Sequence, residues 1–177
     1  MERRCTEPVP AERWREDAWD ACCGPAELVV QRSGAFDLPL DLGQWIAPAT
    51  LRGWIEEETR EPQAAGQSEG AEWLLVLLTF AYAQRMFGST EIARTCRTNG
   101  AFSGICDGQM PVAEELWRFR RKNRPLLQQV LAGVFRRAIC ERFQIEASMV
   151  TPELEADLRC HALERLDLAR HIDGAGE

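Results

Sequence analysis

One apolar segment constrains the fold of this chain more than any other feature. From Trp73 to Ala83 only Thr79 is polar. The segment has half the length that a membrane-spanning helix needs, ~20 residues, and a helix that is apolar on all sides must lie inside a protein. We therefore expect residues 72–87 to form a long central core helix that ends at Gly88.

Helix signals continue after this segment. Ser89 is a favoured N-cap residue, and Pro111 and Pro125 suit the first turn of a helix. Proline also disfavours helical geometry in the residue before it, which predicts a break at Arg124. The sequence therefore predicts helices over residues 89–97, 111–123 and 125–143, with turn signals on both sides of residues 101–106.

The C-terminal part has the pattern of one amphipathic helix that begins at Thr151 and Pro152 and ends near Gly174. No segment has a clear strand pattern, so we predict a mainly α protein built as a compact helical domain. The expected buried face of the last helix is Leu154, Leu158, Ala162, Leu166 and Ala169. The predicted parts are a lead-in (1–60, with a helix from Pro48), a linker (61–70), a helical domain (71–143) and an acidic amphipathic helix (144–177).

Composition limits the classes of function. The 177 residues are 45% apolar and 28% charged with a net charge of −7, which excludes a nucleic-acid binder that is basic overall. Residues 1–8 lack the apolar core of a secretory signal, and the cysteines include no C-x-x-C pair, so we expect reduced thiols and a cytoplasmic protein. Cys160, His161 and His171 do not converge on one point, and no metal site is predicted.

Charge is distributed unevenly along the chain. Between residues 118 and 142 the only acid among many basic side chains is Glu141, whereas acids predominate after residue 143. Such asymmetry indicates an anionic partner. An alternative stays open, because a basic helix is often only a solvated face and the acidic C-terminal helix is able to pair with it.

Two of the predicted short helices combine an apolar face with a basic one. In the helix over 111–123, Leu116 and Phe119 are expected to face the core. In the helix over 89–97, Ile92, Ala93 and Cys96 take that position. The connection between the two helices, residues 98–110, is longer than in a classical helix-turn-helix, so only a helix-turn-helix-like variant is expected. The outward cations are Arg118, Arg121 and Lys122 on one helix and Arg94 and Arg97 on the other.

Residues 70–138 resemble the N-terminal (InsH-type) domain of bacterial insertion-sequence transposases of the DDE class. A weaker likeness extends to residues 38–46. The matching elements are Leu77-Leu78, Ala81-Tyr82-Ala83, Ser89-Thr90-Glu91-Ile92-Ala93-Arg94-Thr95-Cys96-Arg97, Asn99, Ala101, Phe102, Gly108-Gln109, Pro111 and Arg118-Phe119-Arg120-Arg121.

The resemblance implies DNA binding without catalysis. DDE chemistry needs three carboxylates that converge on two metal ions in a ribonuclease-H-like sheet, and residues 144–177 have the pattern of one helix. We therefore expect no enzyme activity, catalytic residue, cofactor or metal. Glu114 and Glu115 occupy positions that are neutral in the family, and carboxylates at a helix start repel phosphates, so the expected contact is with the DNA backbone.

The sequence thus predicts a domesticated, non-catalytic, transposase-derived protein of a mobile element that binds double-stranded DNA. A second copy of the chain is a further candidate partner, and neither a membrane nor a small-molecule substrate is expected. The alternative is a protein-interaction module, or an inactive transposase remnant, whose basic helix pairs with its own acidic helix or an acidic partner. Core positions are expected for Trp45, Trp54, Trp73 and Trp117. The predicted DNA-binding residues are Arg118, Arg120, Arg121, Lys122, Arg124, Arg94 and Arg97.

Overall fold

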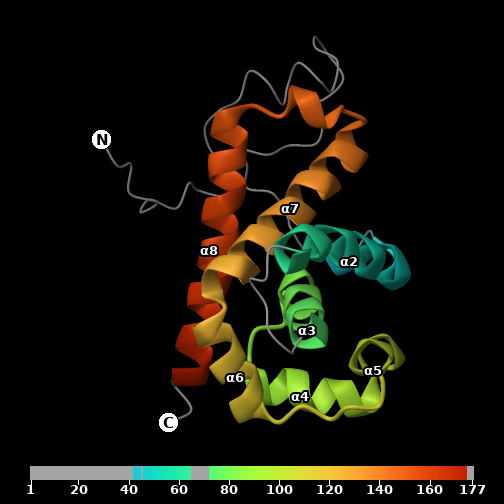
Figure 1. Cartoon of the computed structure of the whole chain (residues 1–177), viewed down its shortest axis with the longest axis vertical. Coiled ribbons are helices and arrows are strands. Elements are labelled where there is room, and N and C mark those ends of the chain that lie inside the picture. Colours follow the sequence, from blue (N-terminus) through green and yellow to red (C-terminus); the bar gives the residue numbers. More distant parts are fainter. Residues whose placement is uncertain (1–41, 45, 65–71, 175–177) are drawn as a thin grey trace.

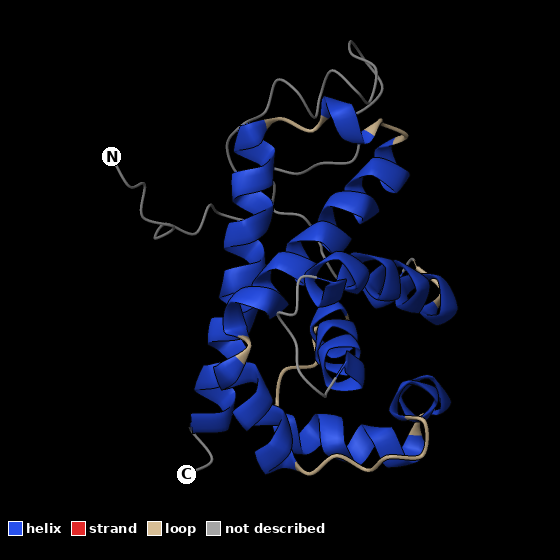
Figure 2. Cartoon of the chain, in the orientation of Figure 1, coloured by secondary structure: helices blue, strands red, loops and turns tan. Residues whose placement is uncertain are grey.

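A computed structural model describes residues 42–44, 46–64 and 72–174. Within these ranges every regular element is a helix, so the mainly α prediction is confirmed (Figure 2). No helix in these ranges is long and apolar enough to cross a membrane. Trp45 and the weaker likeness up to residue 41 lie outside the described residues. The elements are 3-10 helices η3 (Leu42–Gln44) and η4 (Ala147–Met149), and α-helices α2 (Pro48–Ala64), α3 (Glu72–Ala83), α4 (Ser89–Thr98), α5 (Gly100–Cys106), α6 (Ala113–Lys122), α7 (Arg124–Phe143) and α8 (Pro152–Gly174).

The central helix lies where its composition predicts. In Figure 1, α3 stands between the α2–α7 pair on one side and α4 and α5 on the other, and every residue from Leu74 to Ala83 is buried. The helix ends at Ala83, earlier than the predicted stop at Gly88. Arg85 adopts a left-handed conformation with φ 61°, and the Met86 N–H donates to the Ala81 carbonyl at 2.9 Å. These features form a Schellman-type C-cap, which ends a helix without glycine.

The longest helices, α7 and α8, form an antiparallel pair joined through η4 (Figure 1). The five residues predicted as the buried face of α8 are all buried, from Leu154 to Ala169. They pack with α7 residues such as Leu131 and Phe135 in the same apolar core as α2 and α3. The amphipathic period therefore predicted the correct face of α8.

Helix α2 begins at Pro48 as predicted, with Leu51 and Ile55 in the core. It continues to Ala64, four residues into the segment 61–70 that the sequence predicted as a linker. The extension includes Pro62, which helix propensity disfavours, so local propensity does not account for it.

Helices α4, α5 and α6 form the opposite end of the molecule (Figure 1). The connection between α4 and α6 contains α5, whose N-terminus is capped by the Asn99 side chain, which accepts the Ala101 N–H at 2.9 Å. Helix α6 begins at Ala113, two residues after Pro111, because Val112 is extended. Helix α7 begins at Arg124, so the interruption lies at Asn123, one residue before the break predicted at Arg124.

Candidate nucleic-acid interface

Helix α6 combines helix-stabilising charges with one inward stripe. Glu114 and Glu115 lie in its first turn, and its cations lie in the last turn, where each sign is favoured by the helix dipole. Leu116 and Arg120 are buried, one turn apart. Residues two positions away from Arg120 are rotated by about 200°, so Arg118 and Lys122 lie on the opposite side of the helix.

The outer side of α6 carries three predicted DNA-binding residues. Arg118, Arg121 and Lys122 are all exposed, and we call these three residues the basic face. Within the described part of the chain, Arg121 and Lys122 make no ion pair, and Arg118 pairs only with Glu114 of the same helix. An exposed pair at this spacing contributes only about 0.3–0.5 kcal/mol, so it does not hold Arg118 away from a ligand.

Arg120 occupies a different environment from its neighbours. Its side chain is 8% exposed, and its guanidinium donates to the Asp173 carboxylate of α8 at 2.6 Å and to the Tyr82 hydroxyl of α3 at 3.1 Å. Burial lowers the pKa of Arg120, but its contacts with Tyr82 and Asp173 outweigh burial and leave the pKa raised. Arg120 is therefore a charged interior group, and its geometry leaves it out of any contact with phosphate.

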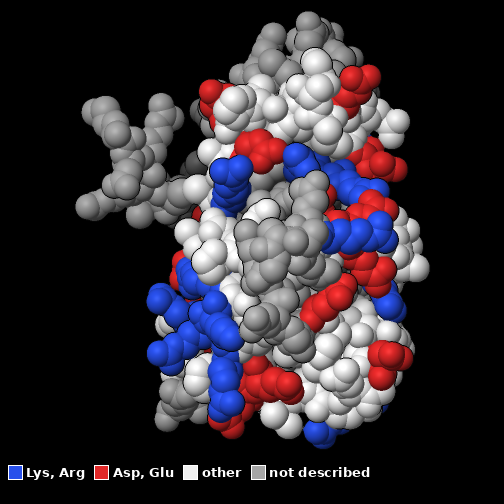
Figure 3. All heavy atoms as spheres, in the orientation of Figure 1, with Lys and Arg blue, Asp and Glu red and all other residues white. Residues whose placement is uncertain are grey.

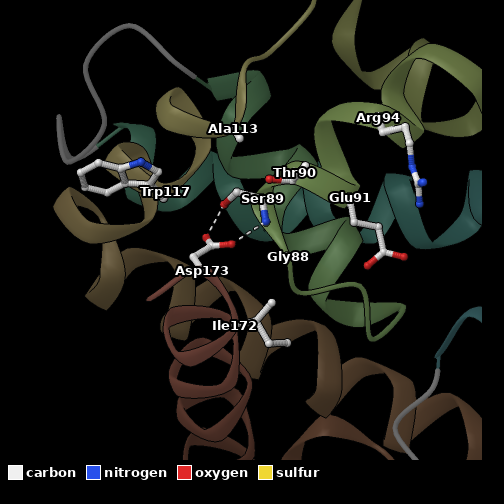
Figure 4. Close-up of a pocket in the computed structure, with 9 residues that line it drawn as sticks. All are labelled: Gly88, Ser89, Thr90, Glu91, Arg94, Ala113, Trp117, Ile172 and Asp173. Atoms are coloured by element: carbon white, nitrogen blue, oxygen red, sulfur yellow. Dashed lines mark hydrogen bonds between the residues drawn. The ribbon is translucent and has the colours of Figure 1, made fainter. Parts of the chain in front are cut away.

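The carboxylate of Asp173 also caps α4. It accepts the Ser89 backbone N–H at 2.8 Å and the Ser89 hydroxyl at 2.5 Å (Figure 4). The sequence predicted Ser89 as the N-cap of its own helix, but Gly88 holds that position and Ser89 is the first helical residue. The prediction was wrong because an acid from a distant helix caps α4 instead. Asp173 thus joins α4, α6 and α8 in one buried polar cluster.

Arg124 begins α7 beside this cluster. It is half-buried and donates to Asp167 of α8 at 2.8 Å. The same Asp167 oxygen lies 3.4 Å from the exposed guanidinium of Arg170. One carboxylate therefore holds two arginines together, and Arg170 adds a cation that the sequence prediction did not include. In Figure 3, basic side chains gather at the lower left, where Figure 1 shows α6 and the C-terminal end of α8.

Arg94 and Arg97 of α4 are exposed, and Ile92, Ala93 and Cys96 are buried, as the pattern predicts. Neither arginine pairs with an acid in the described ranges. They lie on a different helix from the basic face, so the structure groups the seven predicted residues into three outward cations on α6, two on α4, and two arginines held by α8.

A pocket of about 450 Å³ lies between α4, α6 and the end of α8. Figure 4 shows Trp117 and Arg94 at its two ends, with Ser89 and Asp173 between them. Trp54 is buried in the core and the half-buried Trp73 packs against it, so the core prediction is confirmed for these two tryptophans, whereas the half-buried Trp117 lines the pocket instead. The pocket is lined by Gly88, Ser89, Thr90, Glu91, Arg94, Ala113, Trp117, Ile172 and Asp173.

The thiols and histidines offer little chemistry. Burial raises the pKa of Cys96 to about 12 and also raises the pKa values of Cys106 and Cys140, so these thiols stay protonated at neutral pH. Among the described residues, no group of three or more His, Cys, Asp or Glu side chains is placed to hold a metal ion.

The sequence analysis named no individual acid of the C-terminal helix as a partner, so it missed Asp173 and Asp167. A signal was present, because Asp173 lies one turn beyond Ala169 and so continues the buried stripe of α8. Arg120 continues the buried stripe of α6 in the same way, one turn beyond Leu116. An acid and a cation that each extend an apolar stripe are candidates for a buried pair.

Comparisons of the chain with protein-family models, with curated proteins and with solved structures find no match. The resemblance to transposase N-terminal domains therefore depends on the residues quoted above.

Proposed function

We propose that this chain is a non-catalytic, cytoplasmic DNA-binding protein that contacts the phosphate backbone of double-stranded DNA through the basic face of α6. One observation carries the proposal. On a single ten-residue helix, the inward arginine is neutralised by Asp173, whereas Arg118, Arg121 and Lys122 are exposed and receive no acid from another helix among the described residues. Clustered outward cations are what backbone contact requires.

The wider surface supports this assignment. Arg170 of α8 is a further exposed cation, and it shares the carboxylate of Asp167 with Arg124, the first residue of α7. Arg94 and Arg97 add exposed cations on the neighbouring helix α4. The protein has a net charge of −7, so most of its surface repels a polyanion. Binding of a polyanion would therefore be confined to the local positive surface. The resemblance to transposase N-terminal domains supports the same function and an origin in a mobile element.

A second function is favoured by a specific observation. The acidic helix α8 pairs with Arg120 and Arg124, as the protein-interaction alternative expects. These pairs use the inward and half-buried arginines and leave the outward ones exposed. An acidic protein partner would then cover the basic face, and the experiment below separates the two functions.

The test is a titration of a fluorescent 20-base-pair duplex with purified protein at about 50 mM salt, where phosphate contacts are strongest. We expect the wild-type protein to bind and the double variant Arg118→Glu with Arg121→Glu to lose binding at least 100-fold. The matched control is Arg60→Glu with Arg159→Glu, which makes the same charge change at exposed positions on α2 and α8.

The control variant should bind the duplex nearly as well as the wild-type protein. Absence of binding by folded wild-type protein would reject the proposal, and equal losses in both double variants would reduce it to an effect of net charge. If the folded protein does not bind DNA but binds an acidic protein through Arg118 and Arg121, the alternative function is established.

A further inference from the structure

The pocket beside α6 contains a hydrogen-bond donor that the proposed arginine contacts do not use. Trp117 is half-buried at one end of this pocket (Figure 4). Its indole N–H makes no hydrogen bond within the described part of the chain. The indole nitrogen is open to solvent, so a ligand at the pocket is able to accept its hydrogen bond.

Trp117 lies next to the basic face. Ala113, Trp117 and Arg121 follow one another at intervals of four residues and form one stripe along α6. Arg118 is the next residue after Trp117. Trp117 therefore lies within one helical turn of Arg118 and Arg121, so a single DNA strand is able to contact all three side chains.

The charges in the pocket do not oppose an anion at this end. Asp173 is the central acid, and its carboxylate is already bound by Arg120 and by Ser89. Glu91 lies with Arg94 at the end away from Trp117 (Figure 4). Ala113 is the apolar lining residue on the same helix as the indole, whereas the exposed Ile172 lies beside Gly88, with Asp173 between it and Trp117 in Figure 4. The end of the pocket at Trp117 therefore has no unpaired acid among its lining residues, which suits an anionic phosphate.

We propose that Trp117 is a further DNA-binding residue, whose indole N–H donates to a backbone phosphate next to those bound by the basic face. The inference rests on the proposed function and adds a neutral contact to it. A neutral donor displaces no counterion, so this contact contributes to affinity without contributing to the salt dependence of binding.

The experiment compares Trp117→Phe with Trp73→Phe. Phenylalanine keeps an aromatic ring and removes only the indole N–H and part of the ring area. Trp73 serves as the control because it is a half-buried tryptophan on α3 that does not line the pocket. We expect Trp117→Phe to weaken duplex binding about fivefold to tenfold at every salt concentration, with an unchanged slope of log affinity against log salt, and Trp73→Phe to bind as the wild-type protein does.

A second measurement uses the unaltered protein. In a ¹H–¹⁵N correlation NMR spectrum, the assigned indole N–H signal of Trp117 should shift on addition of the duplex, and that of Trp73 should not. Unchanged affinity in Trp117→Phe, equal losses in both variants, a changed salt slope or an unmoved Trp117 signal would each overturn the inference. The proposed function would survive these results as long as Arg118→Glu with Arg121→Glu still abolishes binding, and it fails separately if the wild-type protein does not bind.

Discussion

The two halves of the basic segment differ more in the structure than in the sequence. On α6, Arg118, Arg121 and Lys122 face solvent. On α7, Arg137 pairs with Glu57 of α2 and stacks its guanidinium over the Trp54 ring, with the guanidinium carbon 5.3 Å from the ring centroid.

Arg136 is also paired, with its nitrogens 3.9 Å from Glu58 and 3.5 Å from Glu155. The same kind of side chain is therefore part of the scaffold on one helix and available to a partner on the other. A cluster of cations in a sequence shows charge, but only the neighbouring helices decide which cations are available.

The largest expected effect concerns the inward arginine of α6. Asp173→Ala should lower the free energy of unfolding by ~3–5 kcal/mol, because it leaves the guanidinium of Arg120 buried without its acid and removes the cap of α4. Chemical denaturation measures this. The matched change Asp167→Ala removes an acid that is 43% exposed and should cost at most about 1 kcal/mol. Equal costs would break the distinction between inward and outward cations.

The second prediction compares the two helices directly. In the triple variant Arg118→Ala, Arg121→Ala and Lys122→Ala, the negative slope of log affinity against log salt should become shallower by about 2 to 3 units. The reason is that each lost phosphate contact removes close to one unit of slope. Arg136→Ala with Arg137→Ala should leave the slope unchanged, since both cations already pair with acids. A shallower slope in the α7 variant would show that its ion pairs break when DNA binds.

The third prediction concerns Tyr82 of α3, whose hydroxyl accepts a hydrogen bond from the inward Arg120 of α6. Tyr82 is the only tyrosine in the chain, so its phenolate absorbance reports one group. Burial raises the pKa of Tyr82 from 10.0 to about 12. The folded state therefore favours the protonated phenol. The stability from this shift is fully present below pH 10 and is lost as the pH rises toward 12, at about 1.4 kcal/mol per unit. An absorbance midpoint near 10 in the folded protein would contradict burial of the hydroxyl that contacts Arg120.

The smallest expected effect concerns the exposed ion pair between Arg137 of α7 and Glu57 of α2. The hydrogen bond and charge of Arg137 hold the pKa of Glu57 below its ordinary value of 4.5. A lowered pKa in the folded state means that the pair stabilises the protein above pH 4.5 and that this contribution disappears as the pH falls through the lowered value. Denaturation of Glu57→Gln and wild-type protein should show a small difference at neutral pH that vanishes in acid. A difference that persists in acid would assign the effect to packing.

Much of the fold was predictable because its signals are local. The apolar run 73–83, the prolines at 48, 125 and 152, and the stripe from Leu154 to Ala169 placed helices and their faces within a few residues of the structure. The end of α3 was missed because a Schellman cap at Arg85 needs no glycine, and the cap of α4 because its acid comes from α8. The site was predictable only in part, since helix period indicates that Arg118, Arg121 and Lys122 face outward and Arg120 inward, but it does not identify the acids that pair with Arg120 and Arg124.

By itself the sequence determined which segments are helical, which face of each is apolar and that positive charge gathers on residues 118–142. These properties depend on residues within one or two turns of each other. Tertiary structure decided which arginines are neutralised, because their acids lie 53, 43 and 80 positions away, at Asp173, Asp167 and Glu57. An ion pair needs a separation of a few ångströms, and only the packing of α2 and α8 against α6 and α7 brings residues so far apart in the chain to that distance.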